Sequence, residues 1–600
     1  MILQALLAYA ERDGLGDADF EPVGVRWQIP LTADGRLSGR PIPLSDDPTA
    51  KKPPAKTLKR PFTSPNELTQ TGDKARSYFL CDSLERATLF LDPKFPEKHE
   101  NRRAQHRYFR GLLSAAAESS PAAAPTIQAV LTFLDDASAL AALHADLVAA
   151  KAKPNENVTF AVEGVDLLTL SALRDFWRQR RRTETGTAAA SRETRVCIAT
   201  GELAPTLDTT EKIKGIPGGL AQGTNLISFD KSSFCSFGLE QAQNAPLAPV
   251  AELKIRTALN TLVQHSRDQR LVFNETVYLH WSREPIDNDP LNLLTTAEPD
   301  AVRHLLDSIR GGERQVGIDA NAYYCLGLSG NGARIVVRDW LETTVGQVEK
   351  SVAAWFDGSE IIDPDGVTLR SGHKFGAILY AMVRAELDEL PAALPAALFY
   401  SILRGAPVPL PRTALSAALR RQVIDQRKPD DLRDPRLNPA RLGLIRAVLN
   451  RLPDQPILMT AQLDPACSDS AYLCGRLFAV FSELQPIALE SVNAGVVERF
   501  YASASVTPSL VMGRLFRNAQ NHLSKAEGRG GWRAGAAENI RKDFEHISTR
   551  LGCEFPPTLT LEQQGRFALG FYHQKAAYRQ QGEERAAAKA SREAAAAASA

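Results

Sequence analysis

The sequence lacks the paired cysteines that stabilise small secreted domains and zinc-binding modules. Its seven cysteines are odd in number, widely scattered and without a Cys-x-x-Cys pair, which argues against a disulfide framework and a structural zinc site. No apolar run reaches the ~18 residues that a membrane-spanning helix needs. The apolar start meets Glu11 and Arg12 before a secretory signal could be completed. We therefore expect a cytoplasmic protein that does not enter a membrane.

Net charge is almost absent as well. The chain carries 71 Lys and Arg against 70 Asp and Glu, a formal charge of +1 over 600 residues. This balance excludes a uniformly basic nucleic-acid binder, but a local basic patch can still be cancelled by acidic residues elsewhere. The length predicts three to five compact units.

Recognisable catalytic motifs are also missing. The chain contains no P-loop, no His-Glu-x-x-His and no Gly-x-Ser-x-Gly sequence. Gly327, Gly330 and Gly332 resemble a dinucleotide-binding loop only superficially, because a strand and not a helix is expected after them. Pro364 and Asp365 are more typical of a turn than of a nuclease carboxylate set. We predict no catalytic residue, no metal ligand and no cofactor.

The patterning predicts an α+β front and an all-α rear. Apolar and β-branched runs at 323–328 and 334–337 flank a Ser-Gly-Asn-Gly turn, which is typical of an antiparallel hairpin. From about residue 348 the pattern is helical almost throughout. We interpret 119–125 and 428–439 as linkers or surface loops, and the arginine-rich segment 178–195 as a solvated loop.

The rear of the chain predicts a bundle of four or five helices between about 460 and 582. Thr507 before Pro508 is typical of a helix start, and Thr560 with Gln563 forms a capping-box pattern that opens a last helix running past His573. We divide the chain into an α+β region (1–457), the bundle (458–582) and an Ala-rich tail (583–600). Three apolar stripes have helical spacing: Leu473, Leu477, Val480, Phe481, Leu484; Met512, Leu515, Ala519, Leu523; and Ile540, Phe544, Ile547, Leu551.

Local positive charge is the first functional signal. Residues 51–76 hold seven basic side chains against Glu67 and Asp73, in a Pro-, Thr- and Gly-containing context that is untypical of a helix. We interpret this segment as a mobile basic loop that contacts phosphates, with Asn66 and Gln70 available to base edges. The basic members are Lys51, Lys52, Lys56, Lys59, Arg60, Lys74 and Arg76.

A second basic run follows at 98–110. Its cations include Arg102 and Arg103, and their spacing puts several on one helical face. A solvated surface explains either run alone, whereas the two together favour nucleic acid. His99 and His106 lie among these arginines, whose charge opposes metal binding, so we expect them at the surface or near phosphates.

Two further segments are candidates for nucleic-acid contact. Lys212 and Lys214 adjoin Gly215, Gly218 and Gly219, and glycines let backbone N–H groups approach an anion closely, although an ordinary Gly-Pro turn accounts for them equally well. In the rear bundle a row of polar side chains lies away from the apolar stripe of its helix. It would suit a single strand, while solvated charge is the default interpretation. The row is Arg514, Arg517, Asn521 and Lys525.

Five stretches, in order and spread over most of the chain, resemble the large subunit of the type I-C CRISPR interference complex, the crRNA-guided Cascade assembly. They are residues 1–6; 79–82; 197–260, with Thr200-Gly201-Glu202 and Lys212-Ile213-Lys214-Gly215; 321–340, ending in Arg338-Asp339-Trp340; and 471–574, with Gly475-Arg476-Leu477-Phe478-Ala479 and Phe571-Tyr572-His573-Gln574.

The resemblance implies a non-catalytic role in antiviral defence. Such subunits sit at the 5′-handle end of the crRNA, recognise the protospacer-adjacent motif in double-stranded DNA, help open the duplex into an R-loop and help recruit a helicase-nuclease. The implied partners are the crRNA, the target DNA and the backbone, handle-binding and small subunits. On this interpretation 51–76 is the flank-motif loop.

The resemblance also implies roles for the other segments. Residues 212–219 would contact the crRNA handle or a neighbouring subunit, and Arg514, Arg517 and Lys525 would contact the displaced strand. The bundle is similar to separate small subunits, which in this family are also made from an internal start, here Met459. Two alternatives remain: a nucleic-acid-cleaving enzyme of a defence system, and a scaffold without nucleic-acid contact.

Overall fold

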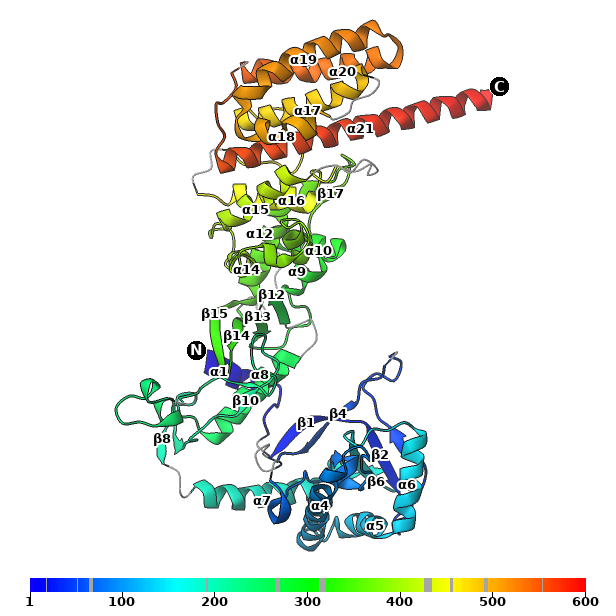
Figure 1. Ribbon diagram of the computed structural model, residues 1–600, viewed down its shortest axis with the longest axis vertical. Helices are drawn as coiled ribbons and strands as arrows, with labels where there is room; N and C mark the ends of the chain where they lie inside the picture. Colours follow the sequence, from blue (N-terminus) through cyan, green and yellow to red (C-terminus); the bar gives the residue numbers. More distant parts are fainter. Residues whose placement is uncertain are drawn as a thin grey trace. The chain divides into compact units, whose positions relative to one another are not determined.

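The structure, a computed structural model, describes residues 1–600 except 18, 51, 64–67, 69, 190–192, 230, 265–269, 274, 312–319, 426–433, 454–456, 490–494, 553 and 600. The chain forms two compact units. The first unit comprises residues 1–264 and 330–336, and the second comprises 265–329 and 337–600. Figure 1 shows the elements in chain order.

The first unit is built on a small mixed sheet. Strand β2 (Trp27–Leu31) runs parallel to β6 (Asn157–Val162), with Ile29 opposite Phe160. Alternate residues of β2 are buried, as expected for a strand with one covered face. The sheet is completed by β3 (Ile42–Pro43), β5 (Asp82–Ser83) and β7 (Val165–Asp166), and β1 (Phe20–Val25) pairs separately with β4 (Lys56–Pro61).

The first unit also contains several helices, the first and last of which pack against each other. They are α1 (Ile2–Arg12), α3 (Leu84–Ala87), α4 (His99–Ser119), α5 (Ala124–Asp135), α6 (Ala137–Ala149), α7 (Ser171–Ala189) and α8 (Pro249–Gln264). Short strands β8 (Thr194–Val196), β9 (Leu203–Pro205), β10 (Lys212–Ile213) and β11 (Thr224–Asn225) lie between α7 and α8. The expectation of a solvated loop at 178–195 is wrong up to Ala189, because the arginines there belong to α7. Burial of Leu173 and Trp177 on one face stabilises this helix.

The second unit begins with the strands β12 (Arg270–Phe273), β13 (Thr276–Ser282) and β14 (Ala322–Asn331). β15 (Arg334–Thr344) follows β14 and neighbours it in the sheet, so the predicted hairpin is confirmed. The helices are α9 (Asn292–Thr296), α10 (Pro299–Gly311), α12 (Val345–Ser359), α13 (Phe375–Tyr380), α14 (Leu394–Leu403), α15 (Arg412–Ile424) and α16 (Pro439–Asn450). A ribbon of β16 (Ile361–Ile362) and β17 (Leu369–Arg370) interrupts them, and Pro364 and Asp365 form its turn as predicted.

The rear bundle contains α17 (Ser470–Ala488), α18 (Val496–Val506), α19 (Pro508–Gly528), α20 (Gly531–Leu551) and α21 (Leu561–Ser599), whose last part extends beyond the other helices in Figure 1. All three predicted stripes are buried. Gln563 N–H and Thr560 Oγ1, and Thr560 N–H and Gln563 Oε1, form the predicted capping box. The α+β front and the all-α rear are therefore confirmed.

Helices α17 and α21 cross at two glycines. A Cβ on Gly475 would lie 2.0 Å from the carbonyl oxygen of Phe567, and a Cβ on Gly570 would lie 2.1 Å from that of Tyr472. The backbones therefore touch without an intervening side chain. Helix α21 also contacts the layer before the bundle, since Gly565 faces Leu449, Ile445 and Leu415. The division of this unit at residue 457 stays a prediction.

Met459, the predicted internal start, is buried in the second unit. Its N–H donates to Asn450 Oδ1 (2.8 Å), and its carbonyl oxygen accepts from Arg446 Nε (2.8 Å) and Asn450 Nδ2 (2.9 Å). A chain that began at Met459 would lack both of these partners. The internal start itself stays a prediction.

His573 of α21 provides a stability prediction. Its Nδ1 lies 3.0 Å from the Tyr472 hydroxyl, and burial, reinforced by Arg446 and Arg476, lowers its pKa to about 3. Because an unfolded histidine titrates near 6.5, only the unfolded state binds a proton below that pH. Above pH 6.5 this titration therefore leaves the free energy of unfolding unchanged. Below pH 6.5 the free energy of unfolding falls by about 1.4 kcal/mol per pH unit toward pH 3.

Denaturant unfolding of the wild type and His573→Gln at pH 7, 6 and 5 checks this dependence. The free energy of unfolding of the variant should fall less steeply with decreasing pH. Equal slopes would contradict the assignment of the buried neutral imidazole as a source of acid sensitivity.

Among the described residues, no single helix is both apolar and long enough to cross a bilayer. The pair α5 and α6 meets these requirements only when joined, and its two members bend by 82° relative to each other.

Candidate nucleic-acid interface

The basic segment 51–76 is only partly a loop. Residues 56–61 form β4, and Arg60 on this strand is buried. Its Nε donates to Glu21 Oε1 (2.9 Å), and its guanidinium carbon lies 3.1 Å from the ring centroid of Tyr78. The expectation of a mobile loop is therefore wrong for β4, because pairing with β1 and the ion pair with Glu21 hold it in place.

The other candidates of this segment differ in accessibility. Lys52, Lys56, Lys59, Gln70 and Lys74 are exposed, and Lys59 Nζ lies 3.3 Å from the carbonyl oxygen of Gly14. Lys51 and Asn66 lie outside the described residues. Lys56 and Lys59 thus lie on a structured strand, and Lys74 is the last residue of a short 3-10 turn, η1 (Gly72–Lys74).

Arg76 connects this segment to α4. Its guanidinium carbon lies 4.7 Å from the ring centroid of Tyr108, a cation–π distance. Beside this contact, η1, α4 and α7 enclose a cavity of about 470 Å³. Its described lining contains cations and no carboxylate: Gly72, Ala75, Ala104, Arg107, Tyr108, Gly111, Leu112 and Arg180.

The chemistry of this cavity favours an anion. Arg107 is two-thirds exposed and has an exposed carboxylate, Glu100, at 3.9 Å, a distance at which solvent weakens the attraction. A concave surface with cations and small residues focuses positive potential and leaves room for a backbone to approach. We name the set Lys74, Arg76, Arg107 and Arg180 the α4 cationic groove.

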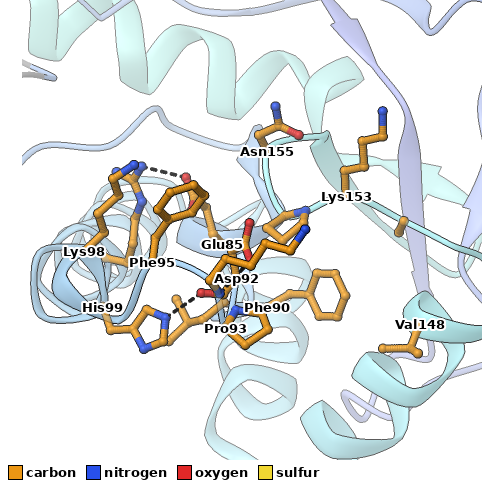
Figure 2. A pocket seen from close by; sticks show the side chains of 15 residues that line it. Glu85, Phe90, Asp92, Pro93, Phe95, Lys98, His99, Val148, Lys153 and Asn155 are labelled. Carbon is orange, nitrogen blue, oxygen red and sulfur yellow. Dashed lines mark hydrogen bonds and ion pairs between the residues drawn. The ribbon is translucent and has the colours of Figure 1, made fainter.

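A second cavity, of about 770 Å³, lies at the N-terminal end of α4. Figure 2 shows Lys98 and Phe95 on one side of it and Lys153 and Asn155 on the other. Lys94 also lines it, and within the described part of the chain none of these three lysines forms an ion pair.

The wall of this second cavity is fixed by polar contacts. Arg102 pairs with Glu85 (2.8 Å) and donates to Gln105 Oε1 (2.7 Å), so this predicted DNA-binding side chain is already engaged. Arg103, in contrast, is 54 % exposed and has an exposed carboxylate, Glu100, at 3.7 Å. His99 Nε2 lies 2.8 Å from the carbonyl oxygen of Asp92.

His106 does not lie at the surface. It is buried, its Nδ1 is 2.8 Å from the carbonyl oxygen of Arg86, and burial lowers its pKa. The expected surface or phosphate-contact role is wrong for His106, because the face of α4 that carries it packs onto α3.

The glycines of 212–219 allow this segment to approach the backbone at Gly330 closely. A Cβ on Gly330 would lie 2.2 Å from the nitrogen of Gly219, and the Gly330 N–H donates to the carbonyl oxygen of Pro217 (2.7 Å). Gly215 and Gly218 have positive φ, as turns of this kind require. Lys212 and Lys214 remain exposed, so an anion here would meet their side chains.

The bundle presents its own cationic surface. Arg514, Arg517 and Lys525 are exposed on α19, and the Arg514 guanidinium carbon lies 4.7 Å from the ring centroid of Phe500. A cavity of about 380 Å³ between α17, α18 and α19 adjoins this pair and is also lined by Arg499, Asn518 and His522.

Comparison with known proteins decides the family. The family model of the CRISPR-associated protein Cas_Csd1 matches residues 6–579. The chain belongs to the Cas_Csd1 family. No curated protein sequence matches this Cas_Csd1 protein.

The resemblance to a CRISPR-associated family is thus confirmed over residues 6–579 of this Cas_Csd1 protein. The structure places Arg76 against Tyr108 of α4, and η1, which ends at Lys74, also contacts α4. Lys212 belongs to β10, which pairs with β11. Arg514, Arg517 and Lys525 share one helix.

The sequence of this Cas_Csd1 protein did not by itself identify several residues that line these cavities. Lys153 follows α6 and reaches the cavity of Figure 2 only through the fold, and Arg180 was assigned to a loop. The helical pattern of Leu173 and Trp177 before the arginines was the signal that could have placed Arg180 on a helix.

Proposed function

We propose that this Cas_Csd1 protein is the non-catalytic large subunit of a type I-C Cascade complex. In this role it recognises the protospacer-adjacent motif in double-stranded DNA, assists duplex opening and R-loop formation, and helps recruit the helicase-nuclease. Its other partners are the crRNA and the backbone, handle-binding and small subunits. The observation that carries the proposal is the α4 cationic groove, together with the exposed lysines Lys52, Lys56 and Lys59 earlier in the same basic segment.

Electrostatics explains why such a surface suffices without catalytic groups. The guide–target heteroduplex is about as stable as the DNA duplex that it replaces, so modest protein contacts to the flanking duplex and the displaced strand tip the exchange. Phosphate contacts position the protein, while base contacts specify the motif. We assign Lys52, Lys56, Lys59, Lys74 and Arg107 to phosphates, and Gln70 to base edges.

Two further contacts complete the proposal. Lys212 and Lys214 suit the crRNA handle or a neighbouring subunit, because both side chains are exposed beside a rigid glycine turn. Arg514, Arg517 and Lys525 suit the displaced strand, because they follow one helix at spacings of three and eight residues.

Replacing Lys59, Lys74 and Arg107 together by alanine should weaken binding of the assembled complex to target duplex. Each lost phosphate contact reduces the slope of log K against log salt by about 0.9, so the triple variant should lose about 2.7 in slope. At physiological salt we expect a loss of about 10- to 100-fold in affinity. A gel-shift titration across salt concentrations with a crRNA-matched duplex measures both quantities.

Arg60 is left unchanged in this experiment because its substitution would disturb the Glu21 ion pair. A control variant replaces Arg303, Lys350 and Arg420, three exposed cations of the second unit, and thereby makes the same change in net charge. Its affinity and salt slope should equal those of the wild type. An unchanged slope for the Lys59, Lys74 and Arg107 triple variant would refute the assignment and favour a scaffold without DNA contact at these residues.

A further inference from the structure

The first turn of α20 carries the most exposed tryptophan among the described residues. Trp532 is 69 % exposed, whereas Trp27, Trp177, Trp281 and Trp355 are at most 5 % exposed. Trp340 is half-buried and stacks on Tyr324 at 5.6 Å. A large aromatic side chain left in water indicates a binding contact, because its burial in the core would otherwise stabilise the fold.

The helix that carries Trp532 packs against α19. Helices α19 and α20 pack through Phe516 and Phe544, whose ring centroids lie 4.7 Å apart, and Arg541 of α20 pairs with Glu527 of α19. Gly530 and Gly531 have φ of +66° and +58° and have nothing within 4 Å of an added Cβ. The glycine turn is therefore open to solvent, and Trp532 follows it directly as the second residue of α20.

The surroundings of Trp532 are cationic. Lys525, Arg529 and Arg533 lie within seven residues of it, and the guanidinium carbon of Arg533 is 5.5 Å from its ring centroid. Glu527, the carboxylate within this stretch, is engaged by Arg541. The sequence neighbours of the tryptophan are glycines and arginines. A protein-docking surface would instead need contiguous apolar side chains.

An exposed aromatic ring among cations matches the chemistry of single-stranded nucleic acid. Bases stack on the ring, while the cations attract the phosphates. The row on α19 leads to this point: Arg514 and Lys525 are eleven residues apart, about 16 Å along a helix, and the turn follows directly. A single strand of a few nucleotides spans that length.

We propose that Trp532 is a base-stacking residue that holds single-stranded nucleic acid at the end of the cationic row of α19. The inference deepens the proposed contact of the bundle with the displaced strand and rests on it. Trp532 supplies what the cations lack, since stacking persists at salt concentrations that weaken phosphate contacts.

Intrinsic fluorescence tests the proposal on the full-length protein. Titration with a 12-nucleotide single-stranded DNA should quench the solvent-exposed component of the emission, and Trp532→Ala should abolish that quenching. The variant should bind the oligonucleotide roughly tenfold more weakly, with an unchanged salt slope, because no charge is lost. Trp532→Phe should retain most of the affinity.

Leu510→Ala is the matched control. Leu510 is 76 % exposed at the other end of α19, so its truncation removes exposed apolar area without a stacking ring, and the affinity should not change. Because Trp532 is exposed, its substitution should also leave folding and the binding of flanking duplex intact.

The outcomes separate this inference from the proposed function. Weakened single-strand binding in both Trp532→Ala and an Arg514/Arg517/Lys525→Ala variant supports both. Weakening by the charge variant alone overturns the stacking role and leaves the displaced-strand contact standing. No change in either variant overturns both, and quenching by another purified Cascade subunit instead of the oligonucleotide identifies a protein contact and overturns the inference.

Discussion

Replacing Asp425 by asparagine should lower the free energy of unfolding by about 3–5 kcal/mol. The Asp425 carboxylate pairs with Arg441 (2.7 Å) and Arg421 (2.6 Å), and the side chains of Asp425 and Arg441 are only 5 % and 3 % exposed. The substitution keeps the shape but removes the charge, so the Arg441 guanidinium stays buried without its counter-ion. Denaturant unfolding followed by circular dichroism measures the loss.

The other contacts of Arg441 explain why it cannot turn toward water. Its Nε donates to the carbonyl oxygen of Ala381 (2.8 Å) and one Nη donates to Gln422 Oε1 (2.9 Å). Asp300→Asn is the matched control, because Asp300 pairs with Arg303 at 3.4 Å on the surface, and we expect a change within about 0.5 kcal/mol. Similar losses in the two variants would contradict the role given to burial.

Replacing Gly475 by alanine should lower the free energy of unfolding by about 3 kcal/mol. The added methyl group would lie 2.0 Å from the carbonyl oxygen of Phe567, so α17 and α21 must separate along their whole contact. Overpacking of a well-packed interior costs typically 1–3 kcal/mol, and we expect the upper end because the obstacle is backbone.

The same substitution elsewhere in the bundle should have the opposite sign. Gly513 lies in α19 with nothing within 4 Å of an added Cβ, so Gly513→Ala should stabilise the protein by about 0.5–1 kcal/mol through its higher helix propensity. Denaturant midpoints of the two variants provide the comparison. Stabilisation by Gly475→Ala would show that the helices do not touch at this glycine.

The rear bundle was predictable because its signals are local. Leu473, Leu477 and Leu484 recur with the period of a helix, and Thr560 and Gln563 cap each other three residues apart. The glycine-rich hairpin after residue 328 was equally readable, since turn chemistry lies within four residues.

The candidate interface was only partly predictable because charge in a sequence does not reveal its partner. Arg60 belongs to a basic run, yet its carboxylate is Glu21, which is 39 residues away along the chain. Lys153 joins Lys98 at one cavity although 54 intervening residues separate them in the sequence. The exposure of Trp532 depends on how α19 and α20 pack, which the spacing of apolar residues does not specify.

The assignment of residues 330–336 to the first unit sets the order in which the chain can mature during synthesis. In that unit Asn225 pairs with Arg334, and Gly330 bonds to Pro217, so its sheet stays incomplete when residue 264 leaves the ribosome. The segment that completes it arrives only after 65 residues of the second unit, 265–329, have been translated. An N-terminal fragment intended for isolated study must therefore extend at least to residue 336. A fragment cut at residue 264 would leave β11 with an open edge.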